Sequence, residues 1–415
     1  MARIRLSTLQ YDKDQGGAAV PNPKFYFLAS QMQHLCGMGR ANDNDSIDTL
    51  LRTGSGSASV LANLEAGFPH LPQAAPTVVL LRKLWSMVRS TLGVSGFLAD
   101  TPLWDNLNLM EVFRLEGFQV WKLAGIKNIA QIYSNNVLKS FQDLQNEFGL
   151  PRQQFYRYLQ LRHALRAQGQ VSVLQLSSNR LLTEVFSGTE RKGMISHVYS
   201  SLLSSVQNSA TLPCRRGWTE DLGDIDGETW ETCLQAGPLT SVSQSHRLSH
   251  LFLLHRVYRT PIQLFRWGRR DSSLCPKLCE GEGSLIHLMW RCPKLHRFWR
   301  SVTEVISSVY QVRVPLDPIV CILGAVDEEV YPPPINIAVI RLLYLARKLI
   351  ARFWLSPHVP TKKQWIDQVN LIIVREHYTY RHRNAPKKFN SIWQPWLETP
   401  GLAPPRLVMT RLLQM

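Results

Sequence analysis

Four potential metal ligands lie close together between residues 275 and 292. Cys275, Cys279, His287 and Cys292 follow the spacing Cys-x3-Cys-x7-His-x4-Cys. Thiolate and imidazole are ligands that suit Zn²⁺, and four of them complete its tetrahedral coordination. Since protein groups fill every position, none is left for an activated water. The spacing therefore predicts one structural zinc ion, bound by these four residues, that folds the segment and performs no chemistry.

Three other interpretations of these residues stay open. Buried cysteines beside a core histidine would give the same composition without a metal. His296 follows Cys292 by four residues and competes with His287 for one ligand position. Redox catalysis is disfavoured because the chain has no Cys-x2-Cys pair. Gly281 and Gly283 allow the chain to turn back between the two halves of the motif, which favours the zinc site.

Basic residues flank the predicted zinc segment on both sides. Aromatic residues interleave with them: Trp267, Trp290, Phe298 and Trp299. Basic groups follow a phosphate backbone while aromatic rings stack on unpaired bases, so this pattern favours single-stranded nucleic acid. Some rings must instead fill a core, and we expect Trp290 and Trp299 to be buried. The candidate contacts are Arg256, Arg259, Arg266, Arg269, Arg270, Arg291, Lys294, Arg297 and Arg300.

The overall charge points to the same partners. The chain of 415 residues has 47 Lys and Arg against 31 Asp and Glu, a formal net charge of +16. A polyanion such as RNA or single-stranded DNA is therefore favoured. Seven cysteines without a visible signal peptide predict a reducing, intracellular location, in nucleus and cytoplasm. The most apolar stretch, residues 337–354, contains four basic residues, so we expect no membrane span.

Helical patterns dominate the chain. Residues 78–92 have apolar side chains at helical spacing. Ser140 is placed to cap a helix that Gly149 ends, and Thr361 with Gln364 forms a capping box before another. We therefore expect a mainly α fold of helical segments with a small zinc-binding domain.

An acidic run between Trp218 and Trp230 allows an enzymatic alternative. Asp221, Asp224, Asp226 and Glu228 could hold two metal ions for phosphodiester hydrolysis. The competing interpretation is an exposed loop that enters a helix, where acids suit the positive end of the helix dipole. We favour the loop, because no partner acids follow at helical spacing.

The motif Ser284-Leu-Ile-His287-Leu-Met-Trp290-Arg-Cys292-Pro, followed by Phe298-Trp299, resembles the C-terminal cysteine-rich domain of LINE-type, non-LTR retrotransposon reverse transcriptases. Further likeness covers much of residues 3–400. Its segments are residues 3–9, 16–22, 101–104, 125–126, 140–151, 155–160, 255–261 and 314–318. Ala18 and Ala19 depart from the family, which usually has Leu and then Gly there.

The family polymerises DNA with an adjacent pair of aspartates, and this sequence contains no Asp-Asp pair. Neither does it contain the family's endonuclease. The resemblance therefore implies a non-catalytic, zinc-dependent C-terminal fragment that binds RNA or single-stranded DNA, with a full-length retrotransposon polymerase as a partner in trans. The alternative is a protein-interaction scaffold, or the product of a decayed insertion.

The resemblance and the local composition together divide the chain into six segments. We expect a remnant that follows the polymerase palm at residues 1–36, a flexible linker at 37–76, and a helical region at 77–215. We then expect the zinc-binding domain at 216–310, a C-terminal helical region at 311–400 and a tail at 401–415.

Overall fold

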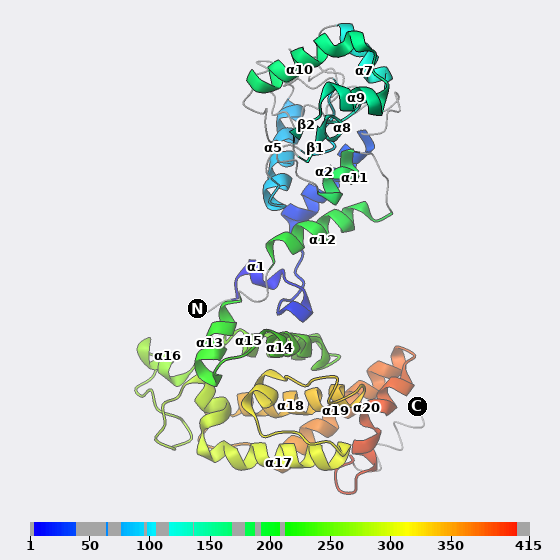
Figure 1. Ribbon diagram of the computed structural model, residues 1–415. Coiled ribbons are helices and arrows are strands. Elements are labelled where there is room, and N and C mark those ends of the chain that lie inside the picture. The colour runs from blue at the N-terminus through cyan, green and yellow to red at the C-terminus, as the bar shows by residue number, and fades with distance from the viewer. Residues whose placement is uncertain are drawn as a thin grey trace. The chain divides into compact units, whose positions relative to one another are not determined.

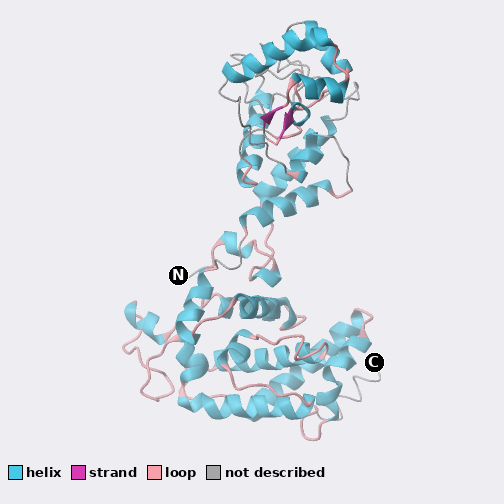
Figure 2. Ribbon diagram, viewed as in Figure 1, coloured by secondary structure: helices cyan, strands magenta, loops and turns pink. Residues whose placement is uncertain are grey.

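The computed structural model describes residues 4–38, 64, 76–94, 98–104, 116–135, 137–167, 179–186, 192–207 and 212–404. Figure 2 shows that helices make up most of these residues. The one sheet among them is the antiparallel pair of β1 (Tyr133–Ser134) and β2 (Val137–Leu138), in which Tyr133 faces Leu138. The expected mainly α fold is confirmed. Two compact units divide the chain: residues 1–20 with 208–415, and residues 21–207.

The unit of residues 21–207 has two hydrophobic clusters. One lies among α2 (Pro23–Met38), α5 (Pro76–Thr91), α11 (Arg180–Phe186) and α12 (Met194–Val206). The second gathers around Trp121 and Leu161. Its elements are η3 (Glu116–Phe118), α7 (Gln119–Leu123), α8 (Ile129–Ile132), the β1–β2 pair, α9 (Phe141–Phe148) and α10 (Phe155–Ala167). The short helix η4 (Arg152–Gln154) leads into α10.

The other unit is built around one large core. Figure 1 shows its helices around α18. The elements before the metal-ligand segment are α1 (Leu6–Leu9), η1 (Lys13–Gln15), α13 (Pro213–Leu222), α14 (Gly227–Leu239), α15 (Gln244–Leu254) and α16 (Pro261–Arg266). The later ones are η6 (His287–Arg291), α17 (Pro293–Tyr310), η7 (Ile319–Leu323), α18 (Ile335–Arg352), α19 (Lys362–His382) and α20 (Pro386–Glu398).

Helix starts follow the capping residues that the sequence contains. Ser140 accepts from the Asp143 backbone N–H at the start of α9, and Gly149 ends that helix at φ +66°. Thr361 accepts from the Gln364 N–H in the same way at α19. The stretch 78–92 corresponds to α5. These local expectations are confirmed because a cap depends only on neighbours in sequence.

Three of the four basic residues in the stretch 337–354 pack against the rest of their unit, and Arg352 is exposed. Arg341 of α18 is 5% exposed and forms a buried ion pair with Glu376 of α19. The Tyr380 hydroxyl and the Trp393 indole are also bonded to this pair. Lys348 contacts the His246 ring of α15. No helix in the described ranges is long and apolar enough to cross a membrane.

The compact units do not follow the expected segment boundaries. Residues 1–20 pack with the C-terminal unit, where the Gly16 carbonyl lies 2.7 Å from His255 Nε2, while α2 belongs to the other unit. The expected boundary at residues 310–311 lies inside one unit, since α17 shares the core of α18, α19 and α20. The physical reason is that none of these amphipathic helices buries its apolar face alone. The linker at 37–76 and the tail at 401–415 fall largely outside the described residues.

Candidate metal centre

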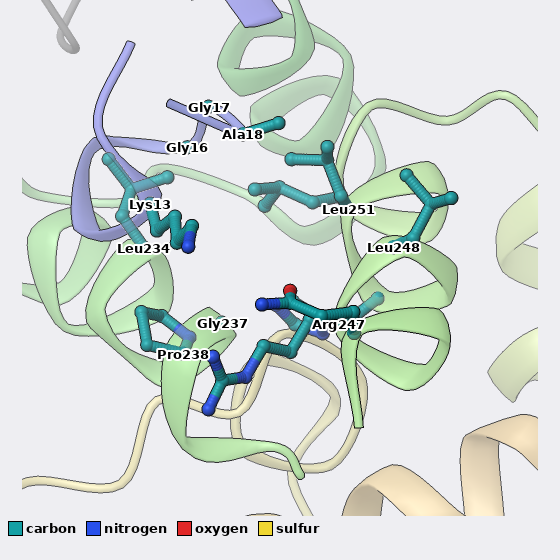
Figure 3. A pocket seen from close by; sticks show the side chains of 13 residues that line it. Lys13, Gly16, Gly17, Ala18, Leu234, Gly237, Pro238, Arg247, Leu248 and Leu251 are labelled. Carbon is teal, nitrogen blue, oxygen red and sulfur yellow. The ribbon is translucent and has the colours of Figure 1, made fainter. Parts of the chain in front are cut away.

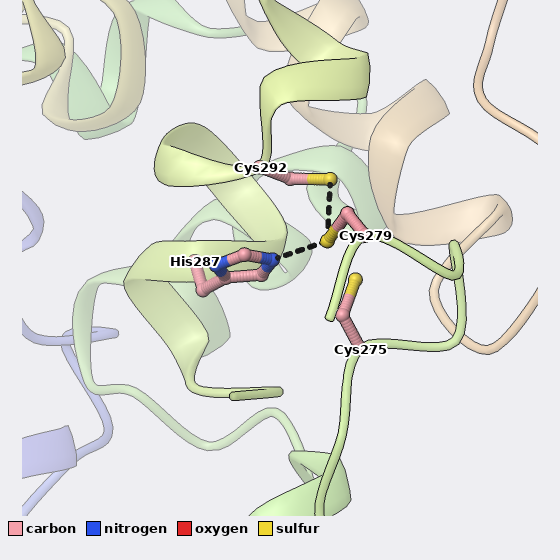
Figure 4. Close-up of side chains that lie close together, drawn as sticks. All are labelled: Cys275, Cys279, His287 and Cys292. Carbon is pink, nitrogen blue, oxygen red and sulfur yellow. Dashed lines mark hydrogen bonds between the residues drawn. The ribbon is translucent and has the colours of Figure 1, made fainter. Parts of the chain in front are cut away.

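A tight turn holds the first two cysteines. The Cys275 N–H donates to the Gly281 carbonyl, 2.8 Å away, and the Leu278 N–H donates to the Cys275 carbonyl. Leu278 and Glu280 adopt positive φ angles of 54° and 63°, so two left-handed residues bend the chain on either side of Cys279. The Leu274–Glu282 bridge closes the base of this hairpin. The turn directs both thiols to one side (Figure 4).

The other two ligands lie on a widened helical turn. The Ser284 carbonyl and hydroxyl accept from the N–H groups of Leu288 and His287, which starts the turn. The Cys292 N–H then donates to the His287 carbonyl, 2.9 Å away, an i to i+5 bond of the π type. In a regular α-helix, residues five apart point to different faces, whereas the π turn brings them closer to one face. His287 and Cys292 therefore face the same point.

The four ligand atoms lie within 4.8 Å of one another. Cys279 Sγ is 3.1 Å from His287 Nε2 and 3.6 Å from Cys292 Sγ (Figure 4). Tetrahedral Zn²⁺ would require about 3.5 Å between sulfur and nitrogen and about 3.8 Å between sulfurs, from its usual bond lengths. The side chains therefore converge as a set that could hold one metal ion.

His287, and not His296, lies among the potential ligand atoms. His296 is exposed on α17, and its ring meets the Trp290 ring edge to face. It does not belong to the group of converging ligand atoms, which uses His287. Gly281 makes room for this choice, because a Cβ at that position would overlap the His287 ring. The sequence had indicated Gly281 only as a turn residue.

A buried lysine lies beside the thiols, and the sequence pattern did not reveal it. Lys277 is 0% exposed, and its Nζ donates to the Phe353 carbonyl at the end of α18, 3.0 Å away. Burial lowers the pKa of Lys277, and the neighbouring cysteines oppose that shift. Burial also raises the pKa of Cys275 to about 12. Only the fold places Phe353 here, so local sequence carries no signal for this contact.

The ligand segment belongs to the main core of its unit. Cys292 is fully buried, and Leu288 and Met289 of the same turn pack inside. The Trp299 indole donates to the Met289 carbonyl, 2.8 Å away. Trp299 is buried as expected, whereas Trp290 is only partly buried against it. The metal-ligand segment is thus continuous with the helical core of its unit.

Asp221 already binds two of the nine basic candidates. The guanidinium of Arg256 donates to the Asp221 carboxylate at 2.6 Å and lies over the Trp218 ring. The guanidinium of Arg291 donates to the Asp221 carbonyl at 2.5 Å. Arg291 therefore ties α13 to the metal-ligand region, and Arg256 ties it to the segment that follows α15. Sequence analysis did not assign these structural roles.

The other seven basic candidates have no side-chain partner within the described part of the chain. They are Arg259, Arg266, Arg269, Arg270, Lys294, Arg297 and Arg300, and all except the partly buried Arg270 are exposed. Arg259 to Arg270 lie on and around α16, while Lys294 to Arg300 lie on the first turns of α17. The expected basic set thus falls into two groups with unpaired charges.

Two acids of the run have structural partners. Asp226 caps α14 by accepting from the backbone N–H and hydroxyl of Thr229. Asp221 is paired with Arg256. Among the described residues, the Cys275–Cys292 cluster alone brings three or more Cys, His, Asp or Glu ligand atoms together. Residues 223–226 form the expected loop entering a helix, whereas Asp221 lies on α13.

A small apolar cavity in the same unit lies between the N-terminal segment and α14–α15 (Figure 3). Its volume is about 90 Å³, and its lining includes Lys13, Leu234, Leu248, His250 and Leu251. None of the metal-ligand or basic candidates lines it.

No protein-family model matches the chain.

Proposed function

We propose that the cluster of Cys275, Cys279, His287 and Cys292 binds one structural Zn²⁺. Three thiolates and one imidazole are a common zinc ligand set. With Zn²⁺ they carry a net charge of about −1, so the buried ammonium of Lys277 provides the compensating charge. Zinc would join the hairpin to the π turn and would contribute on the order of 10 kcal/mol to folding.

Zinc analysis of the purified chain tests this proposal. We expect about one zinc per chain, lost in Cys279→Ser and kept in His296→Ala, since His296 lies outside the cluster. A chain that folds equally well with and without a chelator, and holds no zinc, would contradict a structural metal.

We further propose that this unit binds RNA or single-stranded DNA, mainly through the phosphate backbone. The supporting observation is the set of seven basic side chains without partners on and around α16 and on α17, which flank the metal-ligand segment in the sequence. Unpaired surface cations are free to replace the counterions of a polyanion, whereas Arg256 and Arg291 are not.

Filter binding to single-stranded RNA at several salt concentrations tests this binding. The plot of log binding constant against log salt concentration should lose about 0.7 of its slope for each phosphate that the protein no longer neutralises. The double variant Arg266→Gln with Arg269→Gln should therefore flatten the plot by about 1.4. Arg216→Gln is the matched control, because Arg216 is exposed in the same unit but already paired with Glu220. Salt-independent or undetectable binding by the unaltered chain would refute the proposal.

The resemblance to LINE-type reverse transcriptases leads us to propose that this is a non-catalytic part of such a polyprotein. A full-length retrotransposon polymerase is then the expected partner in trans, inside the cell in nucleus and cytoplasm. Co-purification of the tagged chain with a full-length polymerase tests this, before and after RNase treatment. Retention after RNase treatment supports direct contact, and absence from both samples counts against it.

A further inference from the structure

The surface of α16 presents two aromatic rings to solvent. Phe265 is 49% exposed and Trp267 is 48% exposed. Trp267 is the one tryptophan of twelve that is exposed, since all the others are buried or partly buried. Neither ring has an aromatic partner within the described residues. Exposed aromatic pairs of this kind mark interaction surfaces.

The backbone holds these rings in place. The Arg269 N–H donates to the Leu264 carbonyl and the Gly268 N–H donates to the Phe265 carbonyl, the two bonds of a Schellman motif. Gly268 adopts the left-handed φ of +63° that this ending requires. Thr260 and Gln263 cap the other end reciprocally. Both ends of this short helix are therefore closed by hydrogen bonds.

The metal-ligand hairpin supports the same helix. A Cβ at Gly283 would lie 2.6 Å from Pro261, the first residue of α16, so the hairpin strand packs directly on it. The Gly283 N–H also donates to the Ser273 carbonyl across the hairpin. The position of the rings therefore depends on the segment that carries the ligands.

The segment that carries the rings is basic up to Arg270, and the acid Asp271 follows it directly. Residues 259–270 contain four arginines and no acid. Arg259, Arg266 and Arg269 are exposed and lack partners in the described chain. Rings flanked by unpaired arginines suit a strand whose bases stack on the rings while its phosphates meet the guanidinium groups. In a duplex the bases are already stacked, so these rings cannot reach their faces.

We propose that Phe265 and Trp267 form a stacking face for the unpaired bases of single-stranded nucleic acid. This inference rests on the proposed function and specifies its substrate as unpaired strands. The loss of one stacked base should weaken affinity about five- to 150-fold.

The test compares labelled single-stranded 12-mers with duplexes of the same sequence, using the full zinc-loaded chain. Trp267→Ala and Phe265→Ala should each weaken single-strand binding about ten-fold and leave duplex binding unchanged. Trp267→Phe should keep most of the affinity, since it keeps a ring. Phe252→Ala is the matched control, an exposed aromatic on α15 of the same unit.

Abasic positions in the strand separate stacking from other effects of the substitution. Abasic strands should bind the unaltered chain more weakly than complete strands do, and they should bind Trp267→Ala about as well as complete strands do. The dependence of affinity on salt concentration should be the same for both proteins. An equal abasic effect on both proteins would overturn the stacking face, while salt-dependent binding would still support the proposed function. Loss of self-association in Trp267→Ala without a change in single-strand binding would assign the rings to a protein interface instead. No binding to any strand would refute both proposals.

Discussion

Individual residues shape the candidate metal centre through steric contact. Gly281 lies where any side chain would meet the His287 ring, although its own φ is not in the left-handed region. Its role is thus to allow close approach rather than an unusual backbone angle. Lys277 and Ser284 complete the surroundings by bonding to Phe353 and His287.

Gly281→Ala should displace His287 and reduce zinc affinity about ten- to hundred-fold, similar to the loss of a supporting residue around a metal ligand. Competition with a chromogenic chelator measures this affinity. Gly227→Ala is the control, since an added Cβ there meets nothing within 4 Å. Equal zinc affinity in Gly281→Ala and the unaltered chain would show that His287 is not constrained in this way.

His246 makes stability depend on pH. Burial, followed by the charges of Lys348 and Arg375, lowers the pKa of His246 to about 4 from 6.5. The unfolded chain then binds a proton at pH values where the folded chain does not. The free energy of unfolding should therefore decrease as pH falls from about 6.5 to about 4, by at most about 1.4 kcal/mol per pH unit from this residue.

Urea unfolding across this pH range, compared with His246→Gln, measures the contribution. The variant should show a shallower pH dependence because the titrating ring is gone. His250, whose pKa burial also lowers, and the candidate metal ligands add to the slope in both proteins, so the difference between the two slopes is the informative quantity. Identical slopes would rule out the proposed role of His246.

At the scale of elements, α18 organises its unit because its apolar residues and two of its basic residues, Arg341 and Arg347, are buried. The Arg341–Glu376 pair joins it to α19, and the end of α18 receives the Lys277 bond. Arg347 is also fully buried and donates to the Ile322 carbonyl of η7. The cationic residues of this helix thus connect neighbouring elements instead of facing a partner.

Removing one member of the Arg341–Glu376 pair should destabilise the unit by about 3–5 kcal/mol, because it leaves a buried charge without compensation. Arg341→Met and Glu376→Gln test this by chemical denaturation. The double variant should recover part of the loss, since both buried charges are then absent. Strictly additive losses would indicate that the two side chains do not interact.

At the scale of the whole molecule, the two compact units suggest that metal loss acts on one part of the chain. The metal-ligand cluster lies entirely in the unit of residues 1–20 and 208–415. Zinc removal should therefore increase amide hydrogen exchange in α16, η6 and α17, and leave α2, α11 and α12 protected as before. Hydrogen-exchange mass spectrometry with and without a chelator measures this. Uniform deprotection of both units would contradict independent folding.

Local sequence is sufficient to predict the ligand set, the capped starts of α9 and α19 and the mainly α composition. Each of these depends on residues a few positions apart, where spacing and hydrogen bonding act directly. Which basic residues are unpaired depends instead on distant contacts. Asp221 engages Arg256 and Arg291 across the fold, while Arg266 and Arg269 have no such partner in the described chain.

The exposure of Trp267 and the burial of Lys277 have the same origin. Composition does not distinguish Trp267 from the buried Trp299, because burial depends on which helices pack over a ring. The helices on either side of the expected boundary at residues 310–311 share one core for a related reason, since α17 to α20 pack their apolar faces against one another. Sequence spacing thus determines the chemistry available at the metal centre, and long-range packing determines which side chains around it can meet a partner.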